Sequence, residues 1–107
     1  MSSINEILKK GLSLEEIGVK NWALPKEDAL SVLKKFHAMQ IPVLGGDVCE
    51  IIDGVIQYNY DNWYCDRLSN ESYSAFAHRS IEKAKDYIKS YKSNQSAKIF
   101  FAFVLDE

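Results

Sequence analysis

The segment that decides the fold is VLGGDVCEIIDGVIQYNYDNWYCD, Val43 to Asp66. Its centre is Asp53-Gly54, which stands between two runs of alternating apolar and polar residues. That dipeptide between such runs is typical of a two-residue type I′ turn, so the segment is predicted to form a β-hairpin. The turn also predicts a register, in which the pairs are Ile52 with Val55, Ile51 with Ile56, Cys49 with Tyr58, and Asp47 with Tyr60.

This register predicts which face of the hairpin meets the core. Successive side chains of a strand point to opposite faces. We expect one face to pack against the core; it carries Cys49, Ile51, Ile56, Tyr58 and Tyr60. We expect the other face to be half exposed; it carries Val48, Glu50, Ile52, Val55, Gln57 and Asn59. A slip of one residue would exchange the two faces.

The flanking segments predict helices and one more strand. A short helix is expected up to about Lys10, and a helical turn at Leu14 to Ile17. A second helix begins at Pro25 and ends near Met39, because Pro42 disfavours helix at the residue before it. Its inward stripe is Ala29, Leu30, Leu33, Phe36 and His37. The longest helix lies within residues 71–91, with an inward stripe of Tyr73, Phe76, Ala77, Ser80, Ile81, Ala84, Tyr87, Ile88 and Tyr91. KIFFAFVL, residues 98–105, is predicted to be a strand covered on both faces.

The fold class is therefore α+β, with the order α-α-β-β-α-β. Allowing for a strand near Trp22, we expect a sheet of three or four strands that packs on helices. A length of 107 residues predicts one domain, made of an N-terminal helical segment (1–17) and a core (18–105). No apolar run approaches the roughly 18 residues of a membrane span, and no secretory signal is visible. A cytoplasmic location is expected, with Cys49 and Cys65 as core residues.

Charge is unevenly distributed along the chain. The net charge is −2, but residues 36–66 contain no Lys or Arg and five acids: Asp47, Glu50, Asp53, Asp61 and Asp66. Residues 67–98 carry seven bases and three acids. One interpretation is a solvated acidic hairpin beside a solvated basic helix. The other is an acidic surface that steers a basic partner toward it. Such a surface repels phosphate, so nucleic acid is not an expected partner.

Gly45-Gly46-Asp47 could indicate a phosphate loop or an acidic catalytic centre. A phosphate loop needs a following helix and usually a lysine, whereas a strand follows here. A catalytic or metal centre would need further carboxylates close to Asp47, and Asp61 and Asp66 qualify only if the chain folds back. The sequence therefore favours a structural role, in which the glycines allow a tight turn and Asp47 accepts hydrogen bonds.

Two more groups of residues were candidates for a site. The stretch YDNWYC, Tyr60 to Cys65, could line a ligand pocket, anchor an interface, or place Trp63 at the edge of the core. The candidate metal ligands lack the local spacing of a zinc site; they are Cys49, Cys65, His37 and His78. No metal and no cofactor is predicted.

Several stretches together resemble a known family. They are NWALPKEDALSVLKKF, IPVLGGDV, YDNWYCD and RSIEKAKDYIKSY, followed by a closing apolar strand. Over Gly18 to Leu105 the chain resembles the immunity protein 40 family of bacterial polymorphic-toxin systems. The resemblance implies a small cytoplasmic protein that neutralises a cognate toxin domain by binding it, without catalysis, cofactor or nucleic-acid contact. The motif positions are Trp22, Gly45, Gly46, Asp47, Asn62 and Trp63.

The resemblance and the charge pattern together predict a protein-binding site and a basic, nuclease-like toxin as the partner. The expected partner-binding residues are Trp22, Asp47, Glu50, Asp53, Asp61, Asn62, Trp63 and Tyr64. Two alternatives stay open. One is a small metal- or carboxylate-dependent hydrolase that uses Asp47, Asp61 and Asp66. The other is an accessory or regulatory subunit of an unknown partner.

Overall fold

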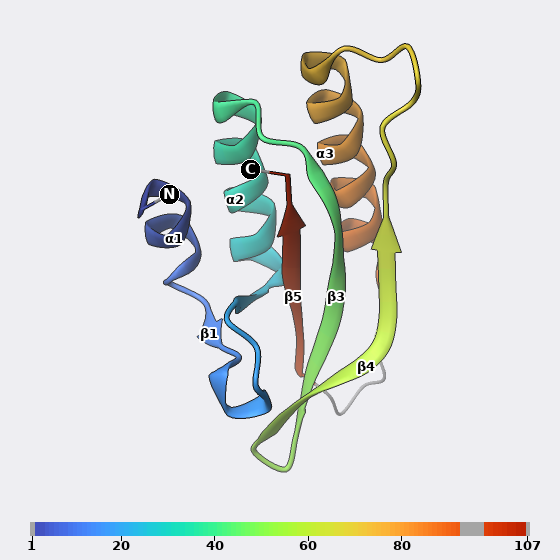
Figure 1. Ribbon diagram of the computed structural model, residues 1–107. Helices are drawn as coiled ribbons and strands as arrows, with labels where there is room; N and C mark the ends of the chain where they lie inside the picture. Colours follow the sequence, from blue (N-terminus) through green and yellow to red (C-terminus); the bar gives the residue numbers. More distant parts are fainter. Residues whose placement is uncertain (1, 93–97, 107) are drawn as a thin grey trace.

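The computed structural model describes residues 2–92 and 98–106 of the chain, and in this part it contains three α-helices, one 3-10 helix and five strands (Figure 1). In chain order they are α1 (Ser2–Leu8), β1 (Leu12–Ser13), η1 (Glu15–Ile17), β2 (Trp22–Pro25), α2 (Lys26–Met39), β3 (Val43–Ile52), β4 (Val55–Tyr64), α3 (Tyr73–Ser90) and β5 (Lys98–Leu105).

The strands of the described residues form one antiparallel sheet in the order β1-β2-β5-β3-β4. The predicted α+β class is confirmed, whereas the predicted three or four strands were too few. The additional strand, β1, has two residues, Leu12 and Ser13, which pair with Ala23 and Trp22 of β2. Two residues are too short a run for alternation to indicate a strand.

Helices α2 and α3 lie side by side on one face of the sheet (Figure 1). The main core fills the space between the sheet and the helices, and α1 adds Ile4 and Leu8 to it. Its largest side chains include Phe36, Phe101 and Phe103. A smaller cluster lies on the other face, where Leu14 covers Ala23, Cys49, Ile56 and Ala102. The sheet is therefore covered on both faces for part of its area.

The central strand β5 is buried from both sides, as its nearly continuous apolar sequence predicted. Phe101 and Phe103 belong to the main core, while Ala102 belongs to the smaller cluster. Helix α3, which packs against β3, is capped at its start by Ser72, whose Oγ accepts a 3.1 Å hydrogen bond from the Ala75 N–H. Its buried residues are Phe76, Ala77, Ser80, Ile81, Ala84 and Ile88, all within the predicted stripe.

Helix α2 turns its inward face slightly away from the predicted position. Its buried residues are Ala29, Val32, Leu33 and Phe36, and His37 is exposed. The assignment of His37 to the inward stripe was therefore wrong. The centre of the buried face lies nearer Val32, and this places His37 at the border of the helix that faces α3. The helix ends at Gln40, which adopts a left-handed conformation two residues before Pro42.

The Asp53-Gly54 turn has positive φ at both residues, 53° and 80°, as a type I′ turn requires. From the turn, Ile52 pairs with Val55, Ile51 with Ile56, and Cys49 with Tyr58. The predicted pairing of Asp47 with Tyr60 was wrong, because Asp47 pairs with Asn62. A bulge causes the shift: three residues, 59–61, occupy the space opposite Val48 alone.

The prediction for the hairpin faces was wrong at two positions. Val48 was placed on the half-exposed face but is fully buried in the main core under the helices. Tyr60 was placed on the core face but is 89% exposed. Both errors have physical causes. The sheet buries residues on two faces rather than one, and Tyr60 lies in the bulge, outside the smaller cluster that covers Cys49 and Ile56.

Candidate partner-binding surface

Gly45-Gly46 makes room for Trp63. Gly46 stands directly opposite Trp63 in the register of β3 and β4. A Cβ atom at position 46 would lie 2.7 Å from Cζ3 of the indole and 2.5 Å from the carbonyl oxygen of Ala102. The indole, which is only 6% exposed, stacks on Tyr87 of α3 with ring centroids 4.7 Å apart. The glycine pair and Trp63 therefore form one packing unit of the core.

Trp22 is also largely structural. It is half-buried and packs against the main core from the start of β2. Its backbone N–H donates a 2.8 Å hydrogen bond to Oδ1 of Asn21, and Nδ2 of Asn21 donates one of 3.0 Å to the carbonyl of Phe103. Of the two tryptophans expected to bind a partner, Trp63 is buried and Trp22 is half-buried.

The bulge in β4 is held by Tyr91, the residue that ends α3. The Tyr91 hydroxyl donates a 2.6 Å hydrogen bond to Oδ2 of Asp61 and accepts one of 2.8 Å from Nδ2 of Asn59. Oδ1 of Asn59 in turn accepts the Asp61 N–H at 2.9 Å. Burial, followed by the hydrogen bond to Asp61, raises the pKa of Tyr91 to about 12. The hydroxyl therefore stays protonated and able to donate in neutral solution.

Tyr60 lies between Asn59 and Asp61 in the chain, and its side chain is exposed to solvent. Its φ is 72°, in the left-handed region that bulky side chains rarely adopt. A conformation of this kind costs about 1–3 kcal/mol and persists only where the surrounding structure imposes it. The contacts of Tyr91 to Asn59 and Asp61 supply that constraint. Tyr60 also borders a cavity of about 380 Å³ whose other walls include Ile17 and Tyr58.

Further exposed side chains follow along β4 on the face away from the helices. Asn62 is exposed opposite Asp47, and Tyr64 is 67% exposed opposite Gly45. On the other side of Gly45 lies Val104 of β5, 47% exposed. We call this surface the β4 patch: Asp47, Tyr60, Asn62, Tyr64 and Val104.

The sequence anticipated part of the β4 patch. Asp47, Asn62 and Tyr64 were expected there, whereas Tyr60 and Val104 were missed. Tyr60 was expected on the core face, but the structure leaves it uncovered there. Val104 was missed because an apolar strand gives no sign of where its cover ends. One base borders the patch: the Lys83 ammonium lies 5.4 Å from the centre of the Tyr64 ring.

The acids of the hairpin are distributed along it. Asp53 is exposed in the turn, Glu50 is half-buried at the cavity beside Tyr60, and Asp61 is exposed at the bulge. Asp47 is half-buried and adds its charge to the effect of burial on Cys49, whose pKa rises to about 11. The Cys49 thiol is therefore protonated in neutral solution, which removes it as a nucleophile.

The hydrolase hypothesis requires Asp47, Asp61 and Asp66 to converge. Asp61 is bound by Tyr91 of the helical layer, while Asp47 lies beside Cys49 and faces away from the helices. In residues 2–92 and 98–106, no three His, Cys, Asp or Glu side chains form a group that could hold a metal ion. The convergence that would support a carboxylate or metal centre is not found in the described part of the chain.

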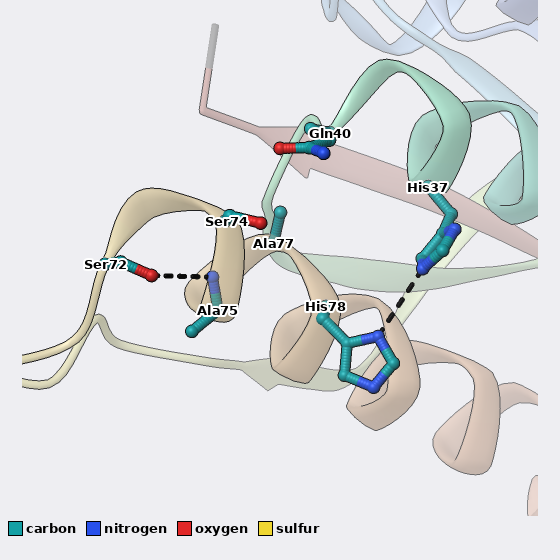
Figure 2. A pocket seen from close by; sticks show the side chains of 7 residues that line it. All are labelled: His37, Gln40, Ser72, Ser74, Ala75, Ala77 and His78. Atoms are coloured by element: carbon teal, nitrogen blue, oxygen red, sulfur yellow. Dashed lines mark hydrogen bonds between the residues drawn. The ribbon is translucent and has the colours of Figure 1, made fainter.

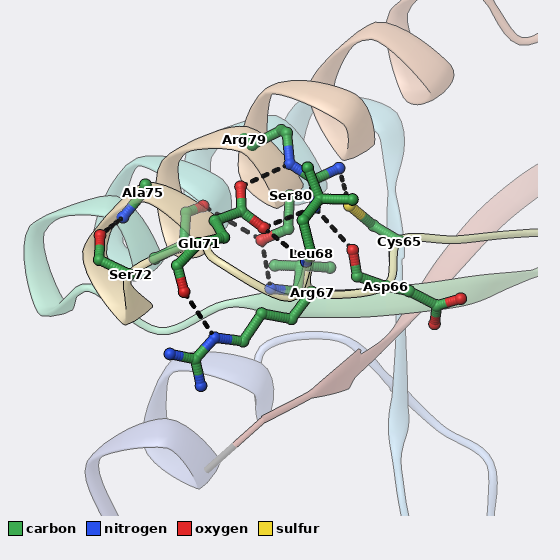
Figure 3. A network of polar contacts seen from close by, with 11 residues as sticks. Cys65, Asp66, Arg67, Leu68, Glu71, Ser72, Ala75, Arg79 and Ser80 are labelled. Carbon is green, nitrogen blue, oxygen red and sulfur yellow. Dashed lines mark hydrogen bonds and ion pairs between the residues drawn. The ribbon is translucent and has the colours of Figure 1, made fainter.

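A polar network fixes the loop that follows β4 to α3 (Figure 3). Arg79 donates to both carboxylate oxygens of Glu71 at 2.7 Å, to the carbonyl of Asp66 at 2.6 Å and to Sγ of Cys65 at 3.2 Å. Its hydrogen bonds lower the pKa of Glu71 to about 2. Cys65 is buried here, as expected of a core cysteine. The network places the end of β4 at a fixed position against α3.

Comparison with known proteins adds one match. The family model described as Immunity protein 40 matches residues 13–105, nearly the whole chain. No curated protein and no solved structure shows a significant match. Within the residues that the structure covers, no helix is long and apolar enough to cross a membrane.

Proposed function

The chain belongs to the immunity protein 40 family and is thus an immunity protein; we propose that it neutralises a cognate toxin domain in the cytoplasm by binding it through the β4 patch. The proposed contacts of the patch are Tyr60, Asn62 and Tyr64 at its centre and Asp47 and Val104 at its border. Glu50, Asp53 and Asp61 add negative charge along the same hairpin. Trp63 is buried, and Trp22 is half-buried and packs against the main core, so the main role proposed for both is to support the fold.

The observation that carries this proposal is the conformation of Tyr60. A glycine or asparagine would occupy a φ of 72° with less strain than a tyrosine. The chain instead holds a large ring there, 89% exposed, and fixes the residues on both sides of it with Tyr91. Strain of this kind collects at functional sites, and exposed tyrosines are frequent hot spots of protein interfaces.

Charge points to the kind of toxin. The hairpin from Val43 to Tyr64 carries Asp47, Glu50, Asp53 and Asp61 and no Lys or Arg. A complementary surface would be basic, and domains that bind nucleic acid present such surfaces because they neutralise phosphates. The surface of a basic, nuclease-like toxin domain therefore complements the charge of this hairpin better than the surface of an acidic toxin domain does.

The test begins with the partner. The tagged protein is purified from its native cells at moderate salt, and the proteins bound to it are identified by mass spectrometry. The expected result is a stoichiometric complex with the C-terminal domain of a large secreted protein. That domain, expressed alone in a host cell, should arrest growth, and co-expression of the immunity protein should restore it.

The surface is tested with variants of the same residue type. Tyr60→Ala and Tyr64→Ala should each raise the Kd for the toxin roughly 10- to 30-fold, the range of interface hot spots. Tyr73→Ala is the matched control, because Tyr73 is an exposed tyrosine on α3. Equal affinity of all three variants for the toxin would refute the β4 patch while leaving the family function intact.

A further inference from the structure

Two histidines from different helices meet on the surface away from the β4 patch. His37 lies near the end of α2 and His78 in the first half of α3, and both are exposed. Nε2 of His37 and Nδ1 of His78 are 3.4 Å apart, and the ring planes are inclined by 65° (Figure 2). They are the only two histidines in the sequence, and 41 positions separate them along the chain.

The distance between the two nitrogens is compatible with two arrangements, a weak hydrogen bond and a pair of ligands of one metal ion. An N–H···N hydrogen bond has a usual length near 3 Å, so 3.4 Å is long for one. Two nitrogens that each lie 2.0–2.1 Å from a tetrahedral metal ion are about 3.4 Å apart. The separation in the structure therefore matches that of two ligands of one ion.

We propose that Nε2 of His37 and Nδ1 of His78 bind one divalent transition-metal ion. Imidazole nitrogen selects ions such as Zn²⁺, Ni²⁺ and Cu²⁺ over Mg²⁺ and Ca²⁺, which take oxygen ligands. The sequence could not indicate this pair, since zinc-site motifs are recognised by local spacing and these ligands come from two separate helices.

The groups around the two histidines set the affinity that we expect for the metal ion. The pair borders a cavity of about 450 Å³ between the two helices, lined also by Gln40 and Ser74, where water can complete the coordination (Figure 2). No third acidic, histidine or cysteine ligand joins the pair among the described residues. A neighbouring cavity beside His37 is lined by three lysines and one glutamate, Lys34, Lys85, Lys89 and Glu82, which gives three positive charges against one negative. A Kd in the micromolar range is therefore expected.

The proposed ion would connect α2 to α3 outside the core. An ion that binds the folded chain and not the unfolded chain stabilises the fold by mass action. The helices lie on the opposite face of the sheet from Asn62 and Tyr64, so occupancy should stabilise the protein without blocking the β4 patch.

The test uses the full-length protein after removal of any histidine tag. Isothermal titration with ZnCl₂ and NiCl₂ should show one ion per chain, and each ion should raise Tm by several degrees, whereas MgCl₂ should not. His37→Ala and His78→Ala should each weaken binding at least tenfold. Both side chains are exposed, so these variants should keep the metal-free Tm and the far-UV circular dichroism of the parent.

Cysteine thiols are the competing ligands, and two measurements separate them from the histidines. Cys65→Ser should bind the ions as the parent does, and bound Co²⁺ should show no thiolate charge-transfer band in the near ultraviolet. The proposal is overturned if neither Zn²⁺ nor Ni²⁺ binds. It is equally overturned if both histidine variants bind like the parent, or if the thiolate band appears.

Discussion

The hydroxyl of Tyr91 lies 2.6 Å from the carboxylate of Asp61, and this contact joins the C-cap residue of α3 to the bulge of the edge strand β4. The same hydroxyl accepts the amide of Asn59. One side chain of the helical layer thus fixes both flanks of Tyr60, and the backbone strain at Tyr60 depends on this contact.

Tyr91→Phe removes the hydroxyl and keeps the ring. Two hydrogen bonds are lost, one of them to a charged group, so the free energy of unfolding should fall by about 1–3 kcal/mol. Urea denaturation of the parent and the variant measures this difference in the free energy of unfolding. Tyr73→Phe is the control, since its hydroxyl makes one exposed hydrogen bond to the Asp106 carbonyl. Equal losses in the two variants would contradict a special role for Tyr91.

Tyr60→Gly separates stability from binding. Glycine adopts a φ of 72° without the steric cost, so the variant should be more stable than Tyr60→Ala by about 1 kcal/mol. Both variants lack the ring, so both should bind the toxin roughly tenfold more weakly than the parent. If the two variants are equally stable in urea, the backbone at residue 60 is not strained.

Gly46→Ala tests the packing of Trp63. The added methyl group would meet both the indole ring and the backbone oxygen of Ala102, and the backbone cannot move aside easily. We expect a loss of about 1–3 kcal/mol in the free energy of unfolding, as for overpacked cores. Gly18→Ala is the control, because its Cβ meets no atom within 4 Å although φ is 81°. A smaller loss at position 46 than at position 18 would contradict the close fit.

Charge reversal tests electrostatic steering by the hairpin. Glu50→Lys combined with Asp53→Lys should slow association with the toxin about tenfold at low salt and reduce the salt dependence of the association rate. Stopped-flow mixing measures both. Glu82→Lys, an exposed site on α3, makes a change of the same sign in the helical layer. Unchanged association rates in the double variant would refute steering.

The lowered pKa of Glu71 predicts how the stability of the fold depends on pH. Its pKa falls from the usual 4.5 to about 2 in the folded chain, so its ionised form is favoured by folding. The stabilisation is complete above about pH 4.5 and is lost as pH falls toward 2. Glu71→Gln should flatten the decrease of Tm over this interval. Glu82→Gln should leave the decrease unchanged, and a parent-like curve for Glu71→Gln would argue against the Arg79 contact as its cause.

The sequence predicted those features that depend on neighbouring residues. The Asp53-Gly54 turn, the helix that starts after Pro25 and the stripe of α3 all follow from local patterns, and the structure contains them. The bulge did not follow, since it depends on Tyr91, a residue about 30 positions further along the chain. The same reason explains the left-handed conformation of Tyr60 and the meeting of His37 with His78.

The members of the candidate site depend on packing between segments that the sequence does not show. Of the residues expected to bind a partner, Asn62 and Tyr64 are exposed on the hairpin. Trp63 could not be assigned from the sequence, because a tryptophan between exposed neighbours is typical both of an interface and of a core edge. Its burial depends on the space above Gly46, which only the paired strands reveal.

The alternation along β4 has one more consequence. Trp63 secures the strand from the helical side, while Asn62 and Tyr64 stand on the other side without a part in the main core. The proposed contact residues can therefore be exchanged while the packing stays intact. If the proposal holds, a few substitutions in a single strand would change toxin specificity without rebuilding the protein that carries them.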